Sequence, residues 1–140
     1  MKRFLMASML ICALVLGLTL AVSAQAPKNL ASVYVYDFED VKIGAGYARL
    51  FDGGLAVAVN VDGVSKKPIL VNLTGIYFLP EFLENLKLYA GAGATYDVDA
   101  KATTGHALVG ASFSYLFAEY QYGFGADADA TIRGGLRIQF

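Results

Sequence analysis

Apolar and polar residues alternate at a period of two along most of this chain. In residues 131–140, Ile132, Leu136 and Ile138 share one face of an extended segment, and Arg133 and Arg137 lie on the other. Successive side chains of a β-strand point to opposite faces, so this period indicates strands rather than helices. The pattern predicts eight strands, over residues 31–37, 42–51, 55–62, 68–79, 87–98, 106–117, 119–125 and 131–140.

The first 24 residues do not alternate. Lys2 and Arg3 precede a continuous apolar run over residues 4–20, and small residues end the segment at Ala24. This order is typical of a secretory signal peptide cleaved after Ala24. An uncleaved helical anchor is the alternative, because the run is long enough to span a bilayer. We therefore expect a signal peptide over 1–24, a linker over 25–30 and one domain over 31–140.

Composition excludes several classes of protein. With 56% apolar and 16% charged residues, the chain is too hydrophobic to be disordered. It has no second long apolar run, which excludes a polytopic helical membrane protein. Outside the leader, nine basic residues face 12 acidic ones, so nothing favours a nucleic-acid partner.

The less apolar face of the expected strands indicates their surroundings. It consists mainly of Gly, Ala, Ser and Thr with few charges, whereas the solvated face of a soluble sheet is polar. Small residues suit the interior of a narrow eight-stranded barrel. The apolar face then points outward to lipid, where only helices and closed barrels satisfy every backbone group.

The expected fold is thus all-β, a closed antiparallel eight-stranded up-and-down transmembrane β-barrel. The alternative is a soluble periplasmic β-barrel that turns its apolar face inward and binds a small apolar ligand.

Aromatic residues gather near the ends of the expected strands. If the C-terminus lies at one rim of the barrel, five aromatic side chains fall near that rim and form an interfacial girdle. They are Phe51, Tyr77, Phe117, Tyr120 and Phe140.

The last eight residues carry a recognisable pattern: polar, any, Gly, any, any, apolar, any, aromatic. Arg133, Gly135, Ile138 and Phe140 occupy the four specified positions. This resembles the C-terminal targeting signal of bacterial outer-membrane barrels, and the chain after the leader resembles small barrels of the OmpA transmembrane-domain or OmpX type. The resemblance implies an exported protein in the outer membrane of a diderm bacterium, surrounded by outer-membrane lipid. It also implies that the barrel-assembly machinery recognises these four residues.

A catalytic site is not expected. Some small barrels that this chain resembles modify lipid A with a histidine, a serine and an acidic residue. Here His106 and Ser112 are six strand residues apart, about 20 Å, which is beyond hydrogen-bond reach. The acidic residues lack a metal-ligand spacing, so neither a metal site nor a cofactor is expected.

Five inward charges remain: Lys42, Lys87, Glu119, Arg133 and Arg137. A buried carboxylate needs a partner, so we expect Glu119 to pair with Arg137 or Arg133. Such a network either fills the lumen of a structural barrel or gates a narrow outer-membrane pore. Eight strands leave little room for a channel, which favours the structural role.

Overall fold

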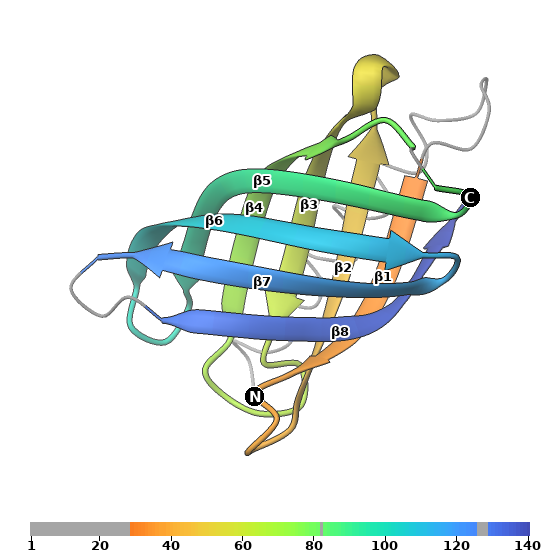
Figure 1. Ribbon diagram of the computed structural model, residues 1–140. Coiled ribbons are helices and arrows are strands. Elements are labelled where there is room, and N and C mark those ends of the chain that lie inside the picture. Colours follow the sequence, from red (N-terminus) through yellow and green to blue (C-terminus); the bar gives the residue numbers. More distant parts are fainter. Residues whose placement is uncertain (1–28, 82, 126–128) are drawn as a thin grey trace.

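The computed structural model of the chain describes residues 29–81, 83–125 and 129–140, which form one closed β-barrel (Figure 1). The proposed signal peptide over 1–24 lies outside the described residues. The strands are β1 (Asn29–Tyr36), β2 (Lys42–Leu50), β3 (Leu55–Asp62), β4 (Leu70–Phe78), β5 (Leu86–Asp97), β6 (Ala102–Phe113), β7 (Leu116–Phe124) and β8 (Ala130–Gln139). Each is antiparallel to its sequence neighbours, and β8 pairs with both β7 and β1. The predicted fold is confirmed.

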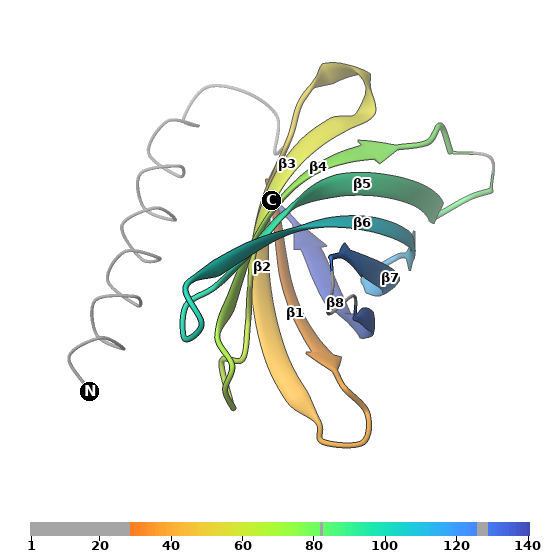
Figure 2. The ribbon, with the colours of Figure 1, turned by 90° about the vertical axis from the view of Figure 1, so that its left-hand side faces the viewer.

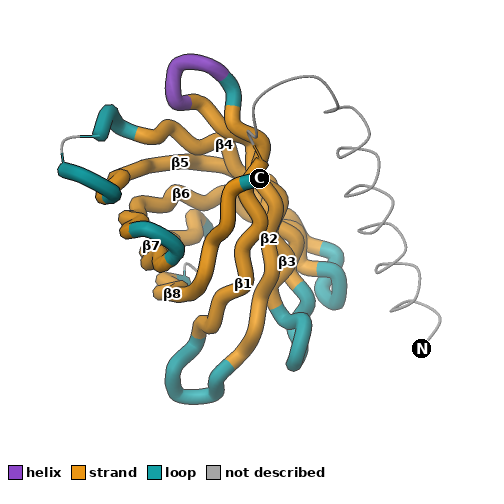
Figure 3. The backbone as a smooth tube through the Cα atoms, turned by 90° about the vertical axis from the view of Figure 1, so that its right-hand side faces the viewer, coloured by secondary structure: helices purple, strands orange, loops and turns teal. Residues whose placement is uncertain are grey.

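The strands are strongly tilted and coil around a common axis (Figure 2). One end carries the 3-10 turn η1 (Asp52–Gly54), the β4–β5 connection, the β6–β7 turn and Phe140 (Figure 3). We call this end the C-terminal rim and the other end the opposite rim. Within the described residues, no helix is long and apolar enough to cross a bilayer.

The apolar residues of the period-two pattern face outward, as predicted. In β3, Ala56, Ala58 and Asp62 are buried, whereas Leu55 and Val57 are exposed. The outer wall is therefore apolar, and the lumen receives the small and polar residues. This is the reverse of a soluble protein, which keeps large apolar patches off its surface.

The first strand begins earlier than the sequence suggests. β1 starts at Asn29 instead of residue 31, so the end of the expected linker belongs to the barrel. The reason lies in the closing ladder, because Asn29 N–H donates to Phe140 O at 3.0 Å and Phe140 N–H donates to Asn29 O at 2.9 Å. These two bonds continue the β1–β8 pairing to the end of the chain.

The β6–β7 turn also differs from the prediction. Phe113 pairs directly with Leu116, so the turn consists of Ser114 and Tyr115, and Ser114 has a φ of 53°. The alternation of Phe113, Tyr115 and Phe117 had suggested one strand reaching to residue 117. Alternation cannot show where two strands meet when the turn itself keeps the period, and the shorter strand puts Phe117 inside the barrel.

At its N-terminal end, strand β6 extends further than predicted. β6 begins at Ala102 instead of residue 106, and its pairing with β5 continues to Asp97 and Ala102. The side chain of Asp97 starts the turn, because its Oδ1 accepts hydrogen bonds from the backbone N–H groups of Asp99 and Ala100, both at 2.9 Å. Asp side chains commonly initiate turns in this way.

Candidate functional site: the lumen network

The deepest charge in the lumen is Arg133, which β8 presents toward β3. Its side chain is 1% exposed and forms an ion pair with Asp62, through Nη2 and Oδ2. Asp62 also accepts hydrogen bonds from Tyr34 Oη at 2.6 Å and from Asn72 Nδ2 at 3.0 Å. The carboxylate thus has three donors from three strands, which compensates for its removal from water.

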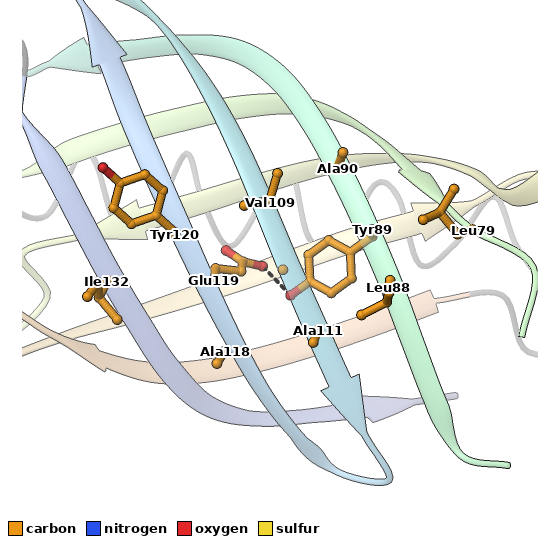
Figure 4. Close-up of a pocket in the computed structure, with 11 residues that line it drawn as sticks. Leu79, Leu88, Tyr89, Ala90, Val109, Ala111, Ala118, Glu119, Tyr120 and Ile132 are labelled. Carbon is orange, nitrogen blue, oxygen red and sulfur yellow. Dashed lines mark hydrogen bonds between the residues drawn. The ribbon is translucent and has the colours of Figure 1, made fainter. Parts of the chain in front are cut away.

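A second carboxylate, Glu119 on β7, lies closer to the C-terminal rim. Its Oε2 accepts from Arg137 Nη2 at 2.7 Å. The same oxygen accepts from Tyr89 Oη at 2.8 Å (Figure 4). Arg133 Nη1 lies 3.8 Å from Glu119 Oε1. The structure therefore contains the expected pairing of Glu119 with Arg137, with Arg133 as a more distant second cation.

The two carboxylates share one local arrangement. Tyr34 on β1 lies opposite Gly44 on β2, and Tyr89 on β5 lies opposite Gly110 on β6. A Cβ on either glycine would overlap the tyrosine ring. Each ring can therefore lie against the backbone of the facing strand only because the residue there is glycine. Each hydroxyl then reaches across the glycine strand to a carboxylate two strands away from the tyrosine, on β3 or β7.

An arginine of β8 completes each unit. The Arg133 guanidinium carbon is 5.3 Å from the centroid of the Tyr34 ring, and that of Arg137 is 4.9 Å from the Tyr89 ring and 4.1 Å from the Phe117 ring. These are cation–π distances. Each unit thus consists of a tyrosine, a glycine, a carboxylate and an arginine. The first three residues of one unit lie four strands away from those of the other, whereas both arginines come from β8.

Polar side chains connect the two units to His106. Arg133 Nη1 donates to Gln121 Oε1 at 2.6 Å, and Gln121 Nε2 donates to Asn72 Oδ1 at 3.3 Å. Thr95 Oγ1 donates to the same Asn72 oxygen at 2.6 Å. Its one proton is then used, so the contact of 2.8 Å between Thr95 Oγ1 and His106 Nδ1 requires that Nδ1 carry the proton.

His106 is a lumen residue, 2% exposed. In the neutral ring with Nδ1 protonated, Nε2 accepts from Thr74 Oγ1, at 2.8 Å. Both ring nitrogens are therefore engaged by threonines. His106 and Ser112 are separated along β6 as the sequence implied.

Two of the five expected lumen charges lie outside this network. Lys42 is at the opposite rim, where its Nζ is 2.8 Å from Asp37 Oδ2. Lys87 is exposed near the C-terminal rim, and no ion pair joins it to a described residue. Both have the predicted strand parity, but they stand at strand ends, where a long side chain reaches water.

Asp62 is the residue that sequence reasoning missed. It follows Asn60 on the inward face of β3 but also directly precedes Gly63. The sequence therefore allows two interpretations, an inward strand residue or a residue of the following turn. The signal that would have identified it is charge balance. Two arginines on one inward face require two carboxylates, and Glu119 supplies only one.

The predicted girdle is only partly at the rim. Phe51, Tyr77 and Phe140 are exposed near the C-terminal rim. Tyr120 is exposed too, but it lies at the centre of β7. Phe117 is 5% exposed and packs inside the barrel against Tyr34, because the β6–β7 turn reverses its expected direction.

The sequence missed two aromatic residues at this rim. Phe113 and Tyr115 flank the β6–β7 turn, and both are exposed. They belonged to the alternation that extended the sixth expected strand. Among the described residues, the outward aromatic side chains at the C-terminal rim are therefore Phe51, Tyr77, Phe113, Tyr115 and Phe140.

The four residues of the C-terminal pattern divide between the two faces of β8. Arg133 is buried in the lumen and Gly135 lies beside Tyr34, whereas Ile138 and Phe140 are exposed on the outer wall. The recognition of these residues by an assembly machinery stays a prediction.

A depression of about 560 Å³ lies on the outer wall over β5–β8 (Figure 4). Ala111 and Ala118, which are paired in register, supply small side chains there, and the larger side chains of Val109, Tyr120 and Ile132 also line it. These side chains have the outward parity of their strands. The depression therefore belongs to the outer surface and not to a ligand cavity inside the barrel.

The described residues contain no group of three or more His, Cys, Asp or Glu side chains placed to hold a metal ion. Asp97 and Asp99 are engaged at the opposite rim, where Asp97 Oδ1 accepts from the backbone N–H of Asp99 and Asp99 Oδ1 lies 3.3 Å from Lys67 Nζ.

Comparison with known proteins finds likeness in fold alone. No protein-family profile and no curated protein sequence matches the chain. A designed transmembrane β-barrel superposes with a TM-score of 0.63 at 19% identity, covering 83% of this chain and 98% of its own. The designed barrel TMB2.3, solved by solution NMR, gives 0.61 at 18% identity, with 84% and 98% covered. The N-terminal β-barrel domain of Pseudomonas aeruginosa OprF gives 0.57 at 14% identity, with 81% and 100% covered.

Proposed function

We propose that this protein is an integral outer-membrane β-barrel whose role is structural, with a lumen closed by its own side chains. The observation that carries the proposal is the inverted distribution of residues. Val33, Leu73 and Leu136 are each more than half exposed on the outer wall, whereas Arg133 and Asp62 are 1% and 2% exposed in the lumen. Such a wall is stable in lipid, which solvates apolar side chains, and a closed barrel leaves no unpaired strand edge there.

The likeness to designed transmembrane barrels and to the OprF barrel domain supports this environment. The signal peptide expected over residues 1–24 would provide a route to the outer membrane. Exposed aromatic residues at the C-terminal rim suit the level of the lipid headgroups.

The lumen favours a structural role over that of a pore. Side chains from β1, β3, β4, β7 and β8 meet across it through the hydrogen bonds of Asp62 and Arg133. An apolar cluster that includes Leu30, Ile76 and Leu108 fills another part of the interior. An eight-stranded barrel has room for such side chains and little else.

Membrane fractionation tests the proposal. The protein is expected in the outer-membrane fraction, to resist extraction by alkaline carbonate, and to migrate differently on gels before and after boiling in detergent. Release into the soluble fraction by carbonate would refute an integral location. If the purified protein, inserted as single molecules into planar bilayers, conducted ions, the proposal of a closed lumen would be refuted.

The soluble alternative requires an apolar interior cavity that holds a ligand. The buried charges of Asp62, Glu119 and Arg133 occupy the interior instead, and the depression described above opens on the outer wall. The interior therefore favours a membrane barrel over the soluble alternative.

We also propose that the barrel-assembly machinery binds the C-terminal strand. The support is the position of Ile138 and Phe140, which are exposed on the outer wall at the end of the chain. A variant with Phe140→Ala is expected to accumulate unfolded in the periplasm while still folding into vesicles in vitro. Normal assembly of this variant in cells would contradict the recognition.

A further inference from the structure

β8 closes the barrel, and its alternating pattern does not by itself fix the position at which it does so. A slip of one residue would turn Ile132, Leu136 and Ile138 into the lumen, which the pattern forbids. A slip of two residues leaves every side chain on its original face. Another feature must exclude such a slip.

The inward face of β8 contains two charges with different partners. Arg133 pairs with Asp62 on β3, and Arg137 pairs with Glu119 on β7. Among the described residues, the ion pairs of both carboxylates are made by β8 alone, and the carboxylate side chains are 3% and 4% exposed. Without β8 in place, both carboxylates keep hydrogen bonds from neutral side chains but have no ion-pair partner among the described residues of the other seven strands.

Between the two arginines stands Gly135, which pairs with Tyr34 on β1. A Cβ at this position would overlap the backbone of Val33 and Tyr34. A slip of two residues would bring an arginine to this point. It would also move both guanidinium groups away from the carboxylates that they neutralise.

We propose that Arg133, Gly135 and Arg137 form a register key that selects the position at which β8 closes the barrel. The two arginines pair with carboxylates at two different levels along the barrel axis. The glycine between them lies where β8 comes too close to the backbone of β1 for a side chain. A two-residue slip breaks all three matches at once, although it leaves the apolar outer face unchanged.

Cysteine pairs across β8 and β1 read the register directly. Val33 pairs with Leu136, and both are exposed on the outer wall, as is Ile138 two residues further on. In full-length chain with C12S, the pair V33C/L136C reports the native register and the pair V33C/I138C reports a two-residue slip. Each protein is folded into phosphatidylcholine vesicles and oxidised, and the intramolecular disulfide is detected on non-reducing gels.

The decisive variant moves the register key by two residues. The substitutions R133T, G135R, R137G and Q139R shift the Arg–Gly–Arg pattern toward the C-terminus and leave the outward residues untouched. The β7–β8 connection lengthens by two residues, which loops tolerate. The disulfide is expected to move from position 136 to position 138. A disulfide retained at position 136, or closure in neither register, would overturn the proposal.

Two companion variants separate charge from other effects. R133K/R137K keeps both charges and the glycine, so only the native disulfide is expected. D62N/E119Q/R133G/R137G removes the charges together, leaves no uncompensated carboxylate and places only glycine on the inner face at these positions. It is expected to give both disulfides, and a native disulfide alone in this variant would also overturn the proposal.

Discussion

The ring of Tyr89 lies over Gly110, so an added methyl group at this glycine should dislodge the ring. A Cβ on Gly110 would overlap Cζ and Oη of Tyr89, whose side chain is 2% exposed. A rotation of the ring breaks its hydrogen bond to Glu119, 2.8 Å long, and its contact with the Arg137 guanidinium. We therefore consider Gly110→Ala the most informative single substitution in the lumen.

The expected loss can be worked from the two contacts. A hydrogen bond to a charged group contributes about 1.5–3 kcal/mol, and a cation–π contact that is partly removed from water contributes about 0.5–2 kcal/mol. Because the ring keeps some alternative contacts, we expect Gly110→Ala to lower the free energy of unfolding by about 2–4 kcal/mol. The assay is urea unfolding of the protein in lipid vesicles, followed by fluorescence and by the gel shift on heating.

Gly75 provides the matched control. It lies on the outward face of β4, and the nearest heavy atom to an added Cβ is Ala92 O at 3.8 Å, an ordinary contact. Gly75→Ala should leave the free energy of unfolding within about 0.5 kcal/mol of the original. A double-mutant cycle with Tyr89→Phe should show coupling, because both changes remove the same hydrogen bond. A loss for Gly110→Ala no larger than the control, or strict additivity with Tyr89→Phe, would refute the reasoning.

Three further predictions concern the charges and the histidine. Glu119→Ala leaves Arg137 without its carboxylate, so we expect a loss of about 3–5 kcal/mol in the free energy of unfolding and a visible change in heat-modifiability; unchanged behaviour on gels would count against the ion pair. Nitrogen NMR should find the proton of neutral His106 on Nδ1, as the hydrogen bonds of Thr95 require, and the Nε2-protonated form would contradict this network. The hydrogen bond from Lys42 lowers the pKa of the Asp37 carboxyl, which lies in the β1–β2 loop. The contribution of this pair to stability is therefore present above the ordinary aspartate pKa and is lost as the pH falls through the lowered value. In Lys42→Met the Asp37 pKa should rise toward its ordinary value, as measured by NMR titration; no rise would show that Lys42 does not cause the shift.

Much of the barrel could be predicted because strand parity is a local property. The inward position of Glu119 and Arg137 and the outward position of Ile132 follow from the period alone, and the structure agrees. The Glu119–Arg137 pair could be anticipated because both residues lie on adjacent strands of one hairpin. Errors arose where the period continued through a turn, as at Phe117.

Asp62 shows the limit of such reasoning. Its partner Arg133 lies 71 residues away along the chain, and the two strands, β3 and β8, are not neighbours in the barrel. Their meeting depends on the closure of the barrel and on the stagger of its strands. Neither quantity is written in the pattern of any single strand.

The sequence by itself determined that the chain alternates at a period of two, which face of each strand is apolar, and that the charges on the other face are few. These properties depend on the chemistry of residues one or two positions apart. The tertiary structure alone decided which inward side chains meet: that two tyrosines lie over two glycines, that Arg133 reaches Asp62, and that Phe117 packs in the lumen. Contacts across the lumen exist only after β8 has paired with β1, so their geometry is a property of the closed barrel.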